Sequence, residues 1–156
     1  MTPDRLQSGA PAPAFKAADQ TGATVALGDF AGSPLIVYFY PRAFTSGCTT
    51  EACDFRDNYD ALAAAGYQLV GISPDDPDRL ADFIADHNLP FSLLSDPDHD
   101  IARAYGAWGP KKNYGREYDG MIRSTFAIDA AGVVEHAWYN VRAKGHAARV
   151  TQELAS

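Results

Sequence analysis

The chain has 156 residues, of which 46% are hydrophobic and 21% are charged, a size that suits one domain, 1–156, with a single core. Its 13 Lys and Arg against 20 Asp and Glu give a net charge of -7, which disfavours nucleic-acid and anionic-membrane partners. The longest apolar stretch, residues 35–40, is far shorter than the roughly 20 residues of a membrane-spanning helix. Residues 1–15 contain prolines and no apolar segment typical of a secretory signal, so we expect an extended arm and a cytoplasmic location.

Turn residues and hydrophobic periodicity predict alternating strands and helices after this arm. Residues 35–40 are apolar throughout and bounded by prolines, which predicts a central strand buried on both faces. The other expected strands are 24–27, 68–73, 91–94, 123–128 and 133–139, and the expected helices are 48–65, 79–87, 101–105 and 145–154. Residues 106–120 are expected to form a long glycine-containing loop. This order predicts an α/β fold, with a mixed central sheet flanked by helices on both faces.

The two cysteines are the most informative residues of the chain. A helix that begins at about Thr45 or Ser46 places Cys48 in its first turn, where unpaired backbone N–H groups and the helix dipole favour the thiolate. Cys48 also continues the apolar face of that helix, which indicates a recessed nucleophile. The alternative is an inert small residue at a helix start, and the position of Cys48 alone does not decide between them.

Cys53 lies five positions further along the same expected helix and off its apolar face. In an ideal helix this spacing separates the two Cα atoms by about 8.6 Å, whereas a disulfide tolerates about 7 Å. A bond between Cys48 and Cys53 would therefore require the first turns of the helix to unwind.

A metal site is not expected. The four histidines, His87, His99, His136 and His146, show none of the tight zinc spacings with the cysteines. The acidic run at residues 96–100 lacks the glycine and the terminal glutamate of a calcium loop, so we interpret it as a turn and helix cap.

Two segments resemble the peroxiredoxins, specifically the bacterioferritin-comigratory or peroxiredoxin Q branch. They are YFYPRAFTSGCTTEACDFRD at residues 38–57 and GMIRSTFAID at residues 120–129, and weaker similarity continues through WGPKKNYGREYDG and VRAKGH. The resemblance implies a thioredoxin-like fold and reduction of hydrogen peroxide or organic hydroperoxides by a cysteine thiolate.

The resemblance also implies roles for individual residues. The Pro-x-x-x-Thr-x-x-Cys motif of the family falls on Pro41, Thr45 and Cys48, and its distant arginine falls on Arg123. Cys48 would attack one peroxide oxygen while Arg123, Thr45 and backbone N–H groups stabilise the charge that develops on the other. Pro41 would shape the loop and shield the site from water. Without the resemblance, Arg123 would be interpreted as a solvated strand arginine.

Three further residues acquire expected roles in the same way. The backbone N–H of Gly47 would join the donors, Glu51 would orient Arg123, and Cys53 would form an intramolecular disulfide with the sulfenic acid of Cys48. An external dithiol, thioredoxin or a glutaredoxin system, would then recycle the protein without a flavin, haem or metal cofactor. Because the cysteine pair is intramolecular, a monomer is expected.

The loop before Cys48 differs from the usual pattern of this branch at two positions. Ser46 stands where this branch usually has proline, and Phe44 makes the loop more apolar, which favours lipid-like hydroperoxides.

Two other functions are compatible with the sequence. A thiol-disulfide exchanger or peroxide sensor would share the sulfenic step, although the C-x-x-x-x-C spacing differs from the C-x-x-C of general exchangers. A noncatalytic holdase or interaction domain is the third hypothesis, since fold alone does not determine function.

Overall fold

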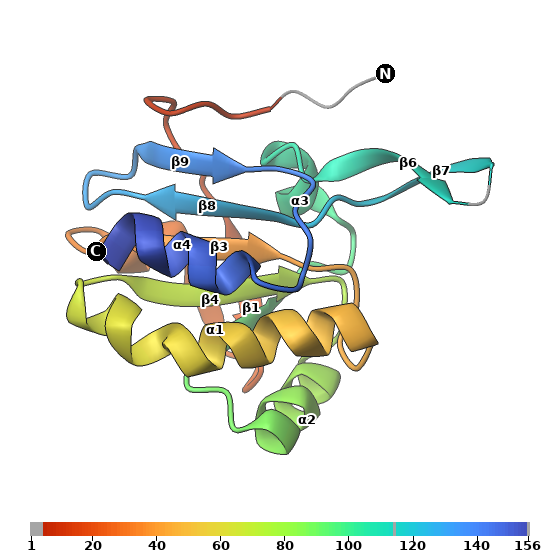
Figure 1. The fold of residues 1–156 in the computed structure, drawn as a ribbon, viewed down its shortest axis with the longest axis horizontal. Helices are drawn as coiled ribbons and strands as arrows, with labels where there is room; N and C mark the ends of the chain where they lie inside the picture. Colours follow the sequence, from red (N-terminus) through yellow and green to blue (C-terminus); the bar gives the residue numbers. More distant parts are fainter. Residues whose placement is uncertain (1–4, 114, 156) are drawn as a thin grey trace.

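The computed structural model describes residues 5–113 and 115–155, and these residues form a seven-stranded mixed sheet and a separate hairpin (Figure 1). The strand order in the sheet is β2-β1-β5-β4-β3-β8-β9. The strands are β1 (Lys16–Asp19), β2 (Thr24–Ala26), β3 (Leu35–Phe39), β4 (Gln68–Ser73), β5 (Ser92–Ser95), β8 (Ser124–Ile128) and β9 (Val134–Trp138). Strands β3, β4 and β5 are parallel, whereas β8 runs antiparallel to β3.

Strand β3 lies between β4 and β8 and is buried at all five positions. Leu35, Val37 and Phe39 point into one hydrophobic cluster, and Ile36 and Tyr38 point into a second cluster on the opposite face. This alternation follows from the two-residue period of a strand. The prediction of a central strand buried on both faces is confirmed.

Helices cover both faces of the sheet (Figure 1). The helices are α1 (Ser46–Ala64), α2 (Pro77–His87), α3 (Asp100–Ala104) and α4 (His146–Ala155), and a 3-10 turn, η1, spans Leu27–Phe30. Side chains of α1, α2 and α4 share the cluster with Tyr38, whereas those of α3 share the cluster with Phe39. The predicted α/β architecture, a mixed sheet between layers of helices, is therefore confirmed. No helix in the described ranges is long and apolar enough to cross a membrane.

The predicted loop at 106–120 is wrong. Strands β6 (Trp108–Asn113) and β7 (Arg116–Met121) pair there as an antiparallel hairpin that projects from the side of the sheet (Figure 1). Most of β7 is solvent-exposed, so this ribbon does not show the apolar alternation that reveals a half-buried strand. Strand β1, which pairs with β2 and β5, was also missed, because only Ala17 of its four residues is buried.

The start of the chain runs beside β9. Gly9 donates its N–H to the carbonyl of Val134 at 2.8 Å, and the N–H of Leu6 reaches the hydroxyl of Tyr139 at 2.8 Å. Residues 1–4 of the expected arm lie outside the described residues.

The topology brings two distant segments to one end of the sheet. Strand β3 ends at Phe39, the chain turns through residues 40–45, and α1 starts at Ser46. Because Phe39 is the register partner of Ser124, the residue that precedes β8 lies beside the start of α1. That residue is Arg123, which therefore comes close to the first turn of the helix.

Candidate active site

The first turn of α1 holds the sulfur of Cys48. Thr45 is the N-cap residue, with extended backbone at φ -80° and ψ 155°, and its carbonyl accepts the N–H of Thr49 at 2.9 Å. The N–H groups of Ser46, Gly47 and Cys48 precede the first intrahelical donor and lie at the positive end of the helix dipole. The predicted helix start is confirmed, and Cys48 is only 1% exposed.

Arg123 joins Cys48 to Glu51. Its Nη2 donates to the Sγ of Cys48 at 3.4 Å, and its Nη1 donates to the Oε1 of Glu51 at 2.6 Å. The side chain is 16% exposed, and burial opposes its charge, yet Glu51 and Cys48 hold the pKa of Arg123 above its ordinary value. One planar guanidinium thus contacts both groups through different nitrogens, a geometry that lysine cannot reproduce.

Glu51 is the most deeply buried charged group of the site. Its side chain is fully buried, and within the described residues its Oε2 has no hydrogen-bond partner. Burial raises the pKa of Glu51 from its ordinary 4.5 to about 7, although the neighbouring Arg123 acts in the opposite direction. The carboxyl group that holds Arg123 therefore titrates near neutral pH.

This raised pKa predicts a pH dependence of stability. Between pH 4.5 and 7 the unfolded chain releases the proton of Glu51 before the folded protein does, so stability falls as pH rises through that window. Relative to Glu51→Gln, the wild type should lose on the order of 3 kcal/mol of unfolding free energy between about pH 4.5 and about pH 8. Urea unfolding of both proteins across this range measures the difference, and parallel pH profiles would contradict it.

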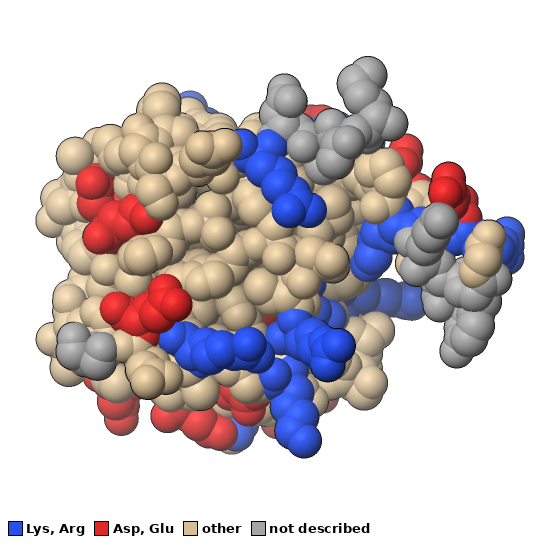
Figure 2. Space-filling model, turned by 45° about the horizontal axis from the view of Figure 1, so that its top comes forward, with Lys and Arg blue, Asp and Glu red and all other residues tan. Residues whose placement is uncertain are grey.

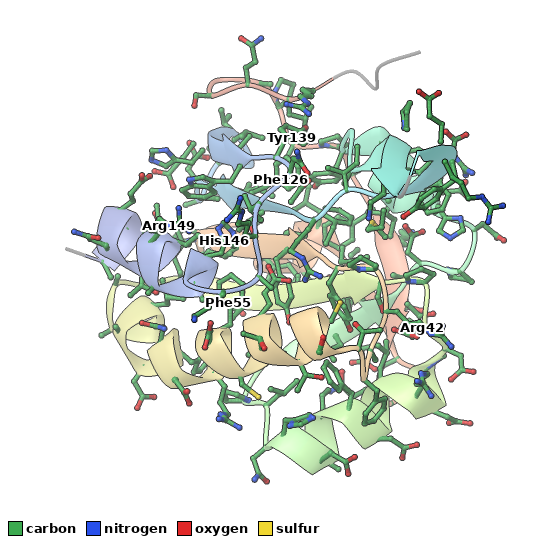
Figure 3. The ribbon with its side chains drawn as sticks, turned by 45° about the vertical axis from the view of Figure 1, so that its right-hand side comes forward. Arg42, Phe55, Phe126, Tyr139, His146 and Arg149 are labelled. Carbon is green, nitrogen blue, oxygen red and sulfur yellow. The ribbon has the colours of Figure 1, made fainter. Side chains whose placement is uncertain are left out.

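The comparison of wild type with Glu51→Gln also removes the effect of a second buried titratable group on the pH dependence of stability. His146, at the start of α4, lies near Phe55 and Arg149 (Figure 3), and its Nε2 is 2.7 Å from the hydroxyl of Thr125. Burial lowers the pKa of His146 to about 4, so its own contribution to stability rises with pH. Because wild type and Glu51→Gln both contain His146, this contribution cancels in their difference.

Gly47 and Lys111 flank the guanidinium. A Cβ atom at Gly47 would lie 3.3 Å from the Nη2 of Arg123, so glycine leaves the room that this group occupies. Lys111, on β6, donates its Nζ to the carbonyl of Met121 at 2.7 Å. Its pKa is lowered by burial and by Arg123, whereas Cys48 acts in the opposite direction. Sequence reasoning missed Lys111 because it lay in an expected loop.

The cations are unevenly distributed over the surface. Figure 2 shows most Lys and Arg side chains of this face gathered toward the half that carries the β6–β7 hairpin, while acidic side chains lie on the opposite half, along the lower edge and beside the hairpin itself. The net charge of -7 therefore coexists with a local positive field. Lys111 and Arg123 bring part of that field to Cys48.

Thr45 and Pro41 occupy the loop before α1. The hydroxyl of Thr45 donates to the carbonyl of Arg42 at 2.8 Å and is solvent-exposed. Pro41 is half-buried two residues after the end of β3. Of the residues singled out from the sequence, the structure brings together four: Cys48, Glu51, Arg123 and Gly47. The hydroxyl proton of Thr45 is instead donated to the carbonyl of Arg42 within the loop.

Cys53 is placed on another side of α1. Its Sγ lies 3.7 Å from the Nδ1 of His87, the last residue of α2, and both cysteines are free thiols. Residues 46–64 form one continuous helix, as expected, so the two cysteines have different neighbours. Sequence reasoning gave His87 no role beside Cys53, because nothing in the local sequence links the two residues.

Comparison with known proteins gives a consistent result. Residues 8–137 match the AhpC/TSA family. The chain is 43% identical over 149 residues to peroxiredoxin Bcp of Bacillus subtilis, covering 96% of this chain and 95% of that protein. It is 45% identical over 141 residues to peroxiredoxin Bcp of Escherichia coli, covering 90% of each.

Solved structures agree with these sequence matches. Peroxiredoxin Q of Xanthomonas campestris superimposes with a TM-score of 0.86 at 32% identity, over 99% of this chain and 97% of that one. The bacterioferritin comigratory protein of the same organism, described with an alkyl peroxide reduction activity, gives a TM-score of 0.85 at 34% identity, over 90% and 89%.

Proposed function

The chain belongs to the AhpC/TSA family, within the Bcp and peroxiredoxin Q type of thiol peroxidase, and from this premise we propose that Cys48 is its peroxide-reactive cysteine. The observation that carries the proposal is the contact of Arg123 with both the Cys48 sulfur and the buried Glu51. A thiolate at a helix N-terminus beside a guanidinium is an activated nucleophile.

In the first step, the Cys48 thiolate attacks one oxygen of hydrogen peroxide or an organic hydroperoxide. The O–O bond breaks, an S–O bond forms, and the leaving oxygen takes a proton and departs as water or an alcohol. Arg123 and the N–H groups of Gly47 and Cys48 stabilise the negative charge on the leaving oxygen. Pro41 and Thr45 shape the loop that borders these donors.

In the second step, Cys53 condenses with the Cys48 sulfenic acid to form a disulfide and release water. Both residues lie within one helix, in which an i,i+5 pair has Cα atoms about 8.6 Å apart. The first turns of α1 must therefore unwind before the bond can form. An external dithiol of the thioredoxin or glutaredoxin class then reduces the disulfide, and the whole cycle requires one copy of the chain.

The burial of Cys48 favours peroxide over a protein disulfide as the first reactant. At 1% exposure Cys48 offers no surface on which a folded protein could dock while α1 is intact. A thiol-disulfide exchanger would have to dock a folded partner on this sulfur. The exchanger function is therefore disfavoured relative to the peroxidase.

The rate of free-thiol loss after stoichiometric hydrogen peroxide tests the proposal without any knowledge of the reductant. The folded, reduced protein should react at least about a thousandfold faster than the same protein unfolded in urea, because only the folded state assembles the donors around Cys48. Equal rates in the two states would show that Cys48 is an ordinary thiol and would overturn the proposal.

A further inference from the structure

The contact between Cys53 and His87 joins α1 to α2. The Cys53 Sγ and the His87 Nδ1 are 3.7 Å apart, within the range for a hydrogen bond that involves sulfur. Both side chains are half-buried, so neither is surrounded by bulk water. The geometry is that of a thiol next to an imidazole that can accept its proton.

Surrounding contacts hold His87 at this position. Arg56 on α1 donates its Nη1 to the carbonyl of His87 at 2.8 Å. The imidazole packs edge-on against Phe83, also on α2, with ring centroids 5.2 Å apart. The ring of Phe44, in the loop before α1, has its centroid 6.5 Å from that of the imidazole. The backbone and the ring of His87 are thus both fixed against α1 and its preceding loop.

Two arginines near the pair have acidic partners of their own, and Asp54 and Asp86 are the chain neighbours of Cys53 and His87. Arg56, on the same helix as Cys53, pairs with Asp57 at 3.1 Å. Arg79, on α2, pairs with Asp75 at 3.5 Å and lies over the ring of Phe44 at 4.9 Å. The hydrogen-bond partner that the structure gives to the Cys53 sulfur is the Nδ1 of His87, which accepts the thiol proton when the ring carries its own hydrogen on Nε2.

A base at this position meets a need of the disulfide-forming step. At neutral pH an ordinary thiol is mostly protonated and a poor nucleophile, whereas the imidazole of histidine accepts protons near neutrality. His87 is the last residue of α2, so its imidazole lies at the negative end of the helix dipole.

We propose that His87 is the general base for Cys53 and accepts its thiol proton while α1 is intact, so that Cys53 is a thiolate when the first turns unwind and its sulfur attacks the Cys48 sulfenic acid. An S–S bond forms, the S–O bond of Cys48 breaks, and the departing hydroxide takes a proton to become water, so no further oxidant is consumed. This inference rests on the proposed function, because it assigns a residue to the second step of that cycle.

The Cys48→Ser protein isolates the effect of His87 on the reactivity of Cys53, since Cys53 is then the sole thiol of the chain. Alkylation of Cys53 by iodoacetamide should be about tenfold slower at pH 7 when His87→Gln is added, because glutamine cannot accept the proton. The difference should narrow toward about pH 10, where thiols ionise without a base. A merely structural role of His87 would change the rate by the same factor at every pH, and that outcome would overturn the proposal.

His136→Gln is the matched control, because His136 lies on β9 with its Nδ1 3.9 Å from the exposed Glu153. It should leave the alkylation profile of Cys53 unchanged. An equal change in both variants would also overturn the assignment of His87.

A single-turnover experiment with both cysteines present separates this inference from the proposed function. After one equivalent of hydrogen peroxide, His87→Gln should form the Cys48 sulfenic acid at the wild-type rate and the disulfide about tenfold more slowly at pH 7. Failure of wild type to form the sulfenic acid would refute the proposed function. Normal sulfenic acid formation with equal disulfide rates in both proteins would refute only the role of His87.

Discussion

Cys48→Ser is expected to abolish peroxide consumption, lowering the rate by at least about 10⁴-fold, to the background of the reagents. A serine hydroxyl stays protonated at neutral pH even beside Arg123 and the start of α1, and its oxygen cannot form a sulfenic acid. Because the residue is small and buried, the substitution keeps the volume close to that of cysteine. Stopped-flow measurement of peroxide loss with reduced protein gives the rate.

Cys53→Ser is the matched control for this experiment. It retains Cys48 and its contact with Arg123, so it should consume the first equivalent of peroxide at the wild-type rate. The cycle should then stop at the sulfenic acid, and excess peroxide should add a mass of about 32 Da as the sulfinic acid forms. Loss of the first turnover in Cys53→Ser, or its survival in Cys48→Ser, would assign the peroxide-reactive role to Cys53 instead.

Arg123→Met is expected to lower the rate of Cys48 oxidation by about 10² to 10³-fold, the usual effect of removing a donor that stabilises charge in a transition state. Arg123 reaches both the Cys48 sulfur and Glu51, so its loss also leaves the Glu51 carboxyl buried without its cation. That second effect should destabilise the fold, because a buried charge without its partner costs about 3 to 5 kcal/mol when ionised.

A double substitution separates catalysis from stability. Arg123→Met with Glu51→Gln removes both members of the buried pair, so most of the lost unfolding free energy should return while the rate of Cys48 oxidation stays low. Peroxide oxidation and urea unfolding are measured on the two variants and the wild type. If the double variant recovers the rate together with the stability, Arg123 acts only by holding the fold.

Arg123→Lys provides a finer comparison within the same experiment. Lysine keeps the positive charge but presents a single nitrogen, so it cannot contact the Cys48 sulfur and Glu51 in the observed geometry. An intermediate rate is expected. A wild-type rate would show that charge alone, without the two-nitrogen contact, is sufficient.

The β6–β7 hairpin shows where sequence patterns stop being informative. The apolar run of β3 predicts its strand because both of its faces are buried, and the boundary of α1 follows from Thr45 and Ser46. Strand β7 is mostly exposed, so its pairing with β6 depends on backbone hydrogen bonds that leave no hydrophobic alternation. Lys111 was missed for this reason.

By itself, the sequence determined the central strand, the mixed sheet and the location of Cys48 in a helix start, because these depend on neighbouring residues and short-range geometry. The resemblance to the peroxiredoxins pointed to Arg123, although the residues around Arg123 by themselves favoured a solvated arginine on a strand. Only the tertiary structure decided that Arg123 contacts Cys48 and Glu51, through the register of β3 with β8, and that His87 contacts Cys53. Such contacts join residues more than 30 positions apart, and their distances depend on how strands and helices pack rather than on local sequence.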